Sequence, residues 1–141
     1  MSIDSYNLFI KSLNKSNTQI IRELVSNGDS LVDPHLLDHF ASFNSRHGCK
    51  SFLKVAYSRG FTGSNSFNYQ RNCWEVHFSR ADIVNENTID DLIEHIERFV
   101  KDFQGQYDGW FTLEQWSNTL NSLFPLAVMD KLTYVEPLLH K

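Results

Sequence analysis

The chain has 141 residues, which suits one domain with its own core, and its 41% hydrophobic and 21% charged residues argue against disorder. Its net charge of −4 offers neither the basic face that nucleic acid requires nor a strongly acidic surface. No stretch approaches a membrane span and the amino terminus lacks the features of a signal peptide, so we expect a cytoplasmic protein.

The spacing of apolar residues predicts three elements in the first half of the chain. Residues 3–27 are predicted to form a helix that stops at Gly28, because glycine tolerates the left-handed conformation that ends helices. The polar run 14–17 leaves open whether this helix is divided in two. Residues 35–43 are predicted to form a strand and residues 48–59 a short helix.

The second half of the chain predicts a hairpin, a helix and a final strand. Residues 61–68 and 73–84 read as two strands, and the second alternates apolar and polar side chains with the period of a half-buried strand. The polar run 69–72 between them is the predicted turn. Residues 85–105 form the clearest helix, with one apolar face and acidic first turns, and residues 106–112 are predicted to form a strand.

After the opening helix, the order of elements is β-α-β-β-α-β. This order predicts an α+β fold, a ferredoxin-like two-layer sandwich with two helices over one face of the sheet. The strands that begin near residues 36 and 73 are expected side by side in its centre. Residues 1–112 are predicted to be the domain, and residues 113–141 a carboxyl-terminal extension whose apolar side chains favour docking on it.

Residues with catalytic or metal-binding chemistry are present, but their pattern is typical of structural positions. Cys49 and Cys73 have no metal-binding or disulfide spacing and are expected as small buried hydrophobes. His35 and His39 would stand about 13 Å apart along a strand, too far for one ion. A site built on His39 and His77 remains an alternative. We therefore expect no cofactor, no metal and no catalytic residue.

The segment Tyr107-Asp108-Gly109-Trp110 is the most unusual feature of the sequence. Glycine inside a strand marks a bulge or a close approach of the backbone, and aspartate often bonds a neighbouring amide. One interpretation is a bulge that directs Trp110 into the core. The other is that Tyr107, Asp108 and Trp110 anchor a protein partner, because aromatic residues dominate binding hot spots. The small size of the domain favours the structural interpretation.

Four acidic residues of the long helix form a second candidate for partner binding. They are Asp90, Asp91, Glu94 and Glu97. Such a set is more often a solvated helix surface than a binding face, and both interpretations stay open.

Several segments together resemble the regulator of ribonuclease E activity B (RraB) family. They are QIIRELVSNGD (19–29), LLDHFASF (36–43), LKVAYSRGF (53–61) and QYDGW (106–110). Their order and spacing are also similar, and the resemblance spans residues 17–112. It implies a ferredoxin-like, non-catalytic protein that binds ribonuclease E. The resemblance implies binding to the arginine-rich, noncatalytic scaffold region of ribonuclease E, which lowers the activity of the enzyme towards RNA.

A protein partner is therefore expected, which the resemblance implies to be ribonuclease E, with no direct contact to nucleic acid or membrane. An alternative within the same fold is an immunity protein or antitoxin that blocks a cognate toxin. The sequence leaves open whether the chain is a monomer or a homodimer.

Overall fold

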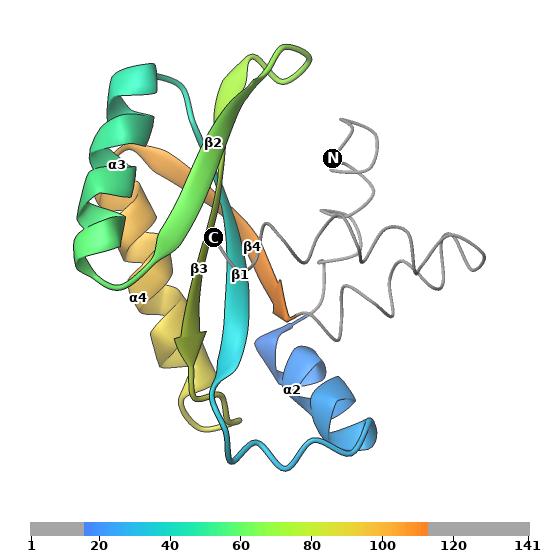
Figure 1. The fold of residues 1–141 in the computed structure, drawn as a ribbon. Coiled ribbons are helices and arrows are strands. Elements are labelled where there is room, and N and C mark those ends of the chain that lie inside the picture. The colour runs from blue at the N-terminus through green and yellow to red at the C-terminus, as the bar shows by residue number, and fades with distance from the viewer. Residues whose placement is uncertain (1–15, 113–141) are drawn as a thin grey trace.

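The computed structural model describes residues 16–112. Residues 3–15 of the predicted opening helix and the predicted extension at 113–141 lie outside the described residues. The described part is α+β, with a four-stranded sheet and three helices, as the sequence predicts (Figure 1).

The three described helices begin at side-chain caps or turns. Helix α2 spans Asn17–Ser26 and opens with a capping box, in which Ser16 and Gln19 each accept a hydrogen bond from the other's backbone N–H. The helix therefore begins within the polar run 14–17. Helix α3 spans Arg46–Ser58, starting two residues before the predicted position. Helix α4 spans Ile89–Asp102, with Asp90 and Asp91 in its first turn.

The four strands lie close to their predicted positions. Strand β1 is His35–Phe43, β2 is Thr62–Asn68, β3 is Cys73–Asp82 and β4 is Gly105–Thr112. Asn72 has a φ of 53°, within the predicted turn between β2 and β3.

Helix α4 differs from its prediction at both ends. The prediction began at residue 85, but the side-chain oxygen of Asn85 accepts backbone N–H groups from Asn87 and Thr88, which forms a turn before the helix. At the other end, the left-handed residue is Gln104, with a φ of 61°, so Gly105 already belongs to β4. Gly105 is needed there because a Cβ atom would overlap the ring of Phe43.

The strands are arranged in the order β2-β3-β1-β4, and each paired neighbour is antiparallel. The prediction that β1 and β3 lie side by side in the centre is confirmed. Strands β2 and β4 are the edges. Helices α3 and α4 lie next to each other on the same side of the sheet (Figure 1).

The core lies between the sheet and these two helices. Phe52 of α3 is fully buried, and its ring lies within 5.1 Å of the rings of Phe43, Phe78 and Phe99. Cys49 belongs to the same cluster and Cys73 is buried in β3, as expected of small hydrophobes. Burial raises the pKa of both thiols.

A second apolar cluster fixes α2 against α4 and the sheet. Its buried members are Ile20, Ile21, Leu24, Leu37, Val84, Ile89, Ile93 and Trp110. Helix α2 thus lies beside the end of β4, as Figure 1 shows. This contact brings the amino-terminal part of the described chain next to the final strand.

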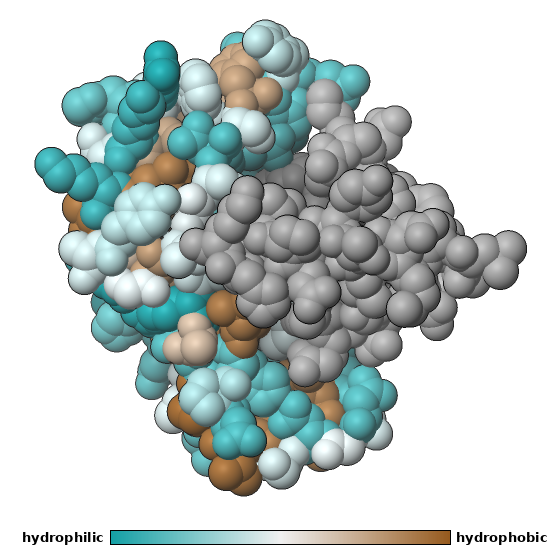
Figure 2. Space-filling view, in the orientation of Figure 1, coloured by the Kyte–Doolittle hydropathy of each residue, from teal (hydrophilic) through white to brown (hydrophobic). Residues whose placement is uncertain are grey.

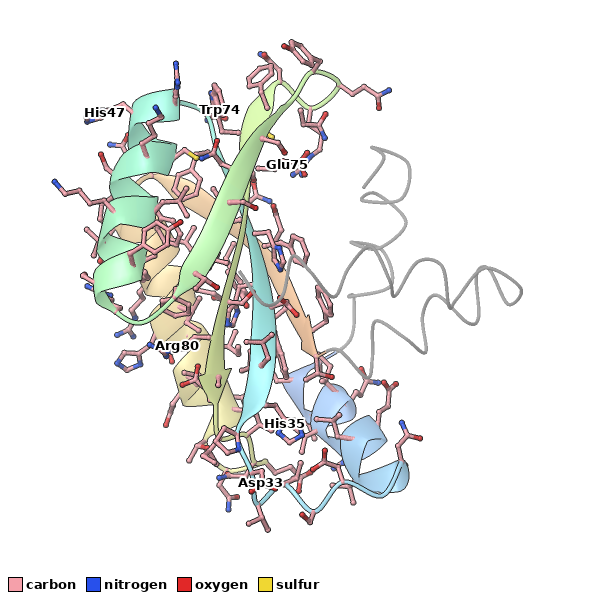
Figure 3. All side chains as sticks on the ribbon, viewed as in Figure 1. Asp33, His35, His47, Trp74, Glu75 and Arg80 are labelled. Atoms are coloured by element: carbon pink, nitrogen blue, oxygen red, sulfur yellow. The ribbon has the colours of Figure 1, made fainter. Side chains whose placement is uncertain are left out.

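Side chains alternate between the two faces of the sheet. Figure 3 shows Trp74 on the side of α3 and its neighbour Glu75 on the opposite side of β3. On that opposite face, the ring of Phe40 stacks between His77, at 4.9 Å, and Phe111, at 5.4 Å. In the view of Figure 2, the described surface carries mainly hydrophilic residues, with hydrophobic ones in small separate groups. Within residues 16–112, no helix is long and apolar enough to cross a membrane.

Candidate functional site

Strand β4 contains a bulge at the segment that the sequence singled out. Phe40 pairs with Gly109, but the next residue of β1, Ala41, pairs with Tyr107, so Asp108 is the extra residue. Gly109 has a φ of 141°, a backbone conformation that residues other than glycine rarely adopt. The predicted glycine-marked bulge is therefore confirmed.

The bulge directs Trp110 into the core, as the structural interpretation predicted. Trp110 is 3% exposed and packs in the apolar cluster of α2. Its indole N–H donates to the side-chain oxygen of Asn17 at 2.8 Å, which satisfies the one polar group of the side chain. No local pattern in the sequence indicates this contact between residues 93 positions apart.

Tyr107 is hydrogen-bonded to a residue of the central strand β1. Its hydroxyl oxygen lies 2.7 Å from Nδ1 of His39, whose ring stacks on Phe78. Burial, and then the negative charges of Glu97 and Asp108, raise the pKa of Tyr107 well above its usual range. Burial, followed by the nearby Arg80 and His77, lowers the pKa of His39 to about 3. Both groups are therefore neutral near pH 7, and Nε2 of His39 is buried without a hydrogen-bond partner.

An open cavity of about 200 Å³ lies where the bulge meets α2 and α4. Its lining residues are Asn17, Ile20, Ile93, Glu97, Tyr107, Asp108, Gly109 and Trp110. We call this the bulge cavity. It brings together four of the seven candidate residues, namely Tyr107, Asp108, Trp110 and Glu97.

Asp108 contributes less charge to this cavity than its position suggests. Its side chain is only 4% exposed, and a carboxylate oxygen lies 3.7 Å from the guanidinium of Arg71. Arg71 also forms an ion pair with Glu75, at 3.3 Å. Glu97 is exposed and is therefore the available negative charge of the bulge cavity.

The four candidate acids of α4 are all exposed, but they divide between two sides of the helix. Asp90, Glu94 and Glu97 follow one another at spacings of four and three residues, which places them on one stripe. Asp91 lies on the other side, where it lines a second cavity. Asp90 accepts a hydrogen bond from Asn17 at 2.9 Å, and Glu94 pairs with Arg98 at 2.6 Å.

The histidines do not converge on one point. His39 faces the helices with Phe78, whereas His77 stacks on Phe40 on the opposite face of the sheet. His35 pairs with Asp29, and Figure 3 shows His35 and His47 at opposite ends of the molecule. Across the described ranges, no group of three or more His, Cys, Asp or Glu side chains is placed to hold a metal ion.

A cluster of Asp38, His77 and Ser79 was missed by sequence reasoning. Asp38 Oδ1 accepts hydrogen bonds from Ser79 Oγ, at 2.6 Å, and from His77 Nε2, at 2.7 Å. A nucleophilic serine requires a base that takes its proton, with the acid behind that base. Here the serine donates to the acid itself and lies 3.5 Å from the histidine, so the cluster lacks that arrangement. Only the register of β1 against β3 would have revealed it.

Comparison with known proteins identifies a family. A family model described as regulator of ribonuclease activity B matches residues 14–112, which is more than half of the chain. A search of curated proteins gives no match.

Proposed function

Because the chain belongs to the regulator of ribonuclease activity B family, we propose that it is a non-catalytic protein that binds ribonuclease E and modulates RNA decay. The family regulates ribonuclease activity, which points to a protein partner. The chain would act by occupying a surface of the enzyme rather than by cutting RNA. Its proposed place of action is the bacterial cytoplasm.

The observation that carries this proposal beyond the family match is the bulge cavity beside the acidic stripe of α4. Glu97 belongs to both, and the aromatic side chains of Tyr107 and Trp110 form part of the cavity wall. A carboxylate next to aromatic groups suits a cationic side chain, above all the guanidinium of arginine. An arginine-rich segment is the partner that the family resemblance implies.

The two aromatic residues have a supporting role in this proposal. Trp110 is buried and Tyr107 is hydrogen-bonded to His39, so neither is free to insert into a partner. They instead hold the shape of the cavity, and the exposed carboxylates of Asp90, Glu94 and Glu97 supply the attraction. The expected interface is therefore electrostatic, with association that weakens as salt rises.

The absence of catalytic function is also part of the proposal. Within residues 16–112, the cluster that contains serine, histidine and aspartate has the wrong order of hydrogen bonds for a nucleophile, because Ser79 donates to Asp38. Cys49 and Cys73 are buried, and burial raises their thiol pKa, which disfavours the reactive thiolate.

We also propose an organisation for the whole chain. The β-α-β-β-α-β order and the central position of β1 and β3 support a ferredoxin-like sandwich. Residues 1–112 would form the family domain, and residues 113–141 would dock on it as an extension. Sedimentation of the full chain and of a chain ending at residue 112 would distinguish a docked extension from a dimerisation segment.

A binding experiment with matched charge variants tests the function. The full chain is immobilised and challenged at low salt with scaffold segments of ribonuclease E. The double variant Glu94→Gln/Glu97→Gln is compared with Glu86→Gln/Asp102→Asn, which removes the same charge elsewhere on the exposed surface. We expect binding to weaken roughly tenfold in the first variant and much less in the second.

The same proteins are then added to an RNA cleavage assay with ribonuclease E. The wild-type chain should slow cleavage, and the Glu94→Gln/Glu97→Gln variant should do so less. No interaction of the wild-type chain at low salt would overturn the proposed function. If both double variants weaken binding equally, the acidic stripe of α4 is not the binding surface.

A further inference from the structure

A second cavity lies on the other side of α4 from the bulge cavity, at the end of α3. Its volume is about 280 Å³, and its lining residues are Arg59, Phe61, Arg80, Asp91, Leu92, His95, Ile96 and Phe99. We call this the arginine cavity. Figure 3 shows Arg80 on the side of the sheet that α4 covers.

Both arginines of this cavity lie against aromatic rings. The guanidinium carbon of Arg59 is 4.1 Å from the ring centre of Phe99, and that of Arg80 is 4.2 Å from the ring centre of Phe61. Such stacking orders the guanidinium group while its N–H edges remain able to donate to an oxyanion. The donors are thus ordered before any ligand arrives.

Arg80 is held in place by further hydrogen bonds, whereas the guanidinium group of Arg59 is available to a ligand. Arg80 donates to Asp82 at 3.0 Å and to the backbone oxygen of Arg59 at 3.1 Å. Arg59 is exposed and forms no ion pair with any residue between 16 and 112. Within the described range, the positive charge of the arginine cavity that no ion pair neutralises therefore belongs mainly to Arg59.

The remaining lining residues narrow the class of ligand. His95 is exposed and uses Nδ1 to contact the backbone oxygen of Asp91, at 3.0 Å, so Nε2 is directed elsewhere. Leu92 and Ile96 add an apolar wall. Asp91 adds a carboxylate, which repels a second negative charge but accepts an amide N–H.

We propose that the arginine cavity binds an aspartate or glutamate side chain of a protein partner, with the partner's backbone amide next to Asp91. This inference rests on the proposed function in taking the partner to be a protein that lies across α4. A peptide carries both the carboxylate for Arg59 and the N–H group for Asp91. RNA also offers an anion and base N–H groups, but its successive phosphates are repelled by the Asp91 carboxylate and by a chain of net charge −4.

The proposal implies a charge pattern in the partner. The stripe of Glu94 and Glu97 lies on one side of α4 and the arginine cavity on the other. A helix with its side chains is roughly 10 Å across. An extended segment covers that distance in about three residues, so a basic and an acidic residue about three apart would reach both sides.

The test uses the isotope-labelled full chain and two small blocked amino acids, N-acetylglutamate N-methylamide and its uncharged glutamine counterpart. Binding is followed by changes in backbone amide chemical shifts. We expect saturable changes at Arg59, Phe61 and His95 with the glutamate probe at millimolar concentration, and none with the glutamine probe. Arg59→Gln should weaken binding roughly fivefold or more, because the charged hydrogen bond is lost.

Two further variants keep the test interpretable. Arg59→Lys retains the charge without the forked donors and should bind with intermediate affinity. Arg22→Gln removes an exposed arginine that pairs with Glu86, neither of which lines the cavity, and it should bind as the wild type does. A spectrum with native dispersion confirms that each variant is folded.

Three outcomes would overturn the proposal. They are no saturable change with the glutamate probe, equal changes with the glutamine probe, and tighter binding of a short single-stranded RNA at the same residues. The probe experiment contains no ribonuclease. A negative result therefore removes the arginine cavity as a binding site without bearing on whether the chain binds ribonuclease E.

Discussion

The hydroxyl of Tyr107 lies 2.7 Å from Nδ1 of His39, and this hydrogen bond joins the bulged edge strand β4 to β1 in the centre of the sheet. His39 is fully buried and Tyr107 partly buried, and both groups are neutral near pH 7. We expect the stability of the bulge, and thus the shape of the cavity beside it, to depend on this pair.

Replacing Tyr107 with phenylalanine removes that hydroxyl and leaves His39 Nδ1 buried without a partner. We expect the free energy of unfolding to fall by about 1–3 kcal/mol. Urea denaturation followed by circular dichroism measures it. The control is Tyr57→Phe, because the Tyr57 hydroxyl donates to Gly63 at an exposed position where water can replace it. Equal losses in the two variants would contradict the structural role of the buried pair.

The depressed pKa of His39 predicts a loss of stability in acid. The folded-state pKa is about 3, against 6.5 in the unfolded chain, so the unfolded state binds more protons between these values. The contribution of His39 to the free energy of unfolding is constant above pH 6.5. It falls as pH drops from 6.5 towards 3, by at most about 1.4 kcal/mol per pH unit.

Unfolding measured from pH 7 down to pH 4 tests this slope. His39→Gln should flatten the pH dependence while lowering stability throughout. His47→Gln, at an exposed position of α3, should leave the slope unchanged. If the free energy of unfolding of His39→Gln shows the same pH dependence as that of the wild type, other groups cause the loss of stability in acid.

Gly109 is required by its backbone conformation. Alanine at a φ of 141° is strained, and Gly109→Ala should destabilise the protein by about 1–3 kcal/mol. Gly28→Ala provides the comparison, because Gly28 has a φ of 93° and its Cβ would meet no atom within 4 Å. That variant should lose about 1 kcal/mol of stability, the cost of placing a side chain in the left-handed conformation alone. Thermal denaturation ranks the two, and a larger loss at Gly28 would argue against the bulge geometry.

The contact between Asn17 and Trp110 predicts energetic coupling between α2 and β4. Asn17→Ala leaves the indole N–H without its acceptor, and Trp110→Phe removes the donor. A double-mutant cycle should give a coupling free energy of about 1 kcal/mol. Additive effects of the two substitutions would show that the hydrogen bond contributes nothing to stability.

The sequence predicted most element limits because its signals are local. The strand at residues 35–43 matches β1 at both ends, and the glycine in the Tyr-Asp-Gly-Trp segment correctly indicated the bulge. The start of α4 was wrong by four residues, because the Asn85 side chain competes for the first amide groups.

The candidate site was less accessible from sequence, because cavities depend on register and packing between distant segments. Glu97 and Asp91 look equivalent along the chain, yet they line different cavities. The contact between Asn17 and Trp110 and the ring stacking of Arg59 and Arg80 likewise join residues that no local pattern relates.

The bulge of β4 also bears on self-association. A regular strand at the border of a sheet exposes backbone groups that can recruit another strand, a common route to aggregation. The extra residue Asp108 and the unusual backbone of Gly109 interrupt that regular spacing on the β4 side. An incoming strand would meet this irregular backbone at Asp108 and Gly109, which disfavours regular pairing along β4. The bulge therefore protects this border of the sheet against non-selective pairing with extended peptides.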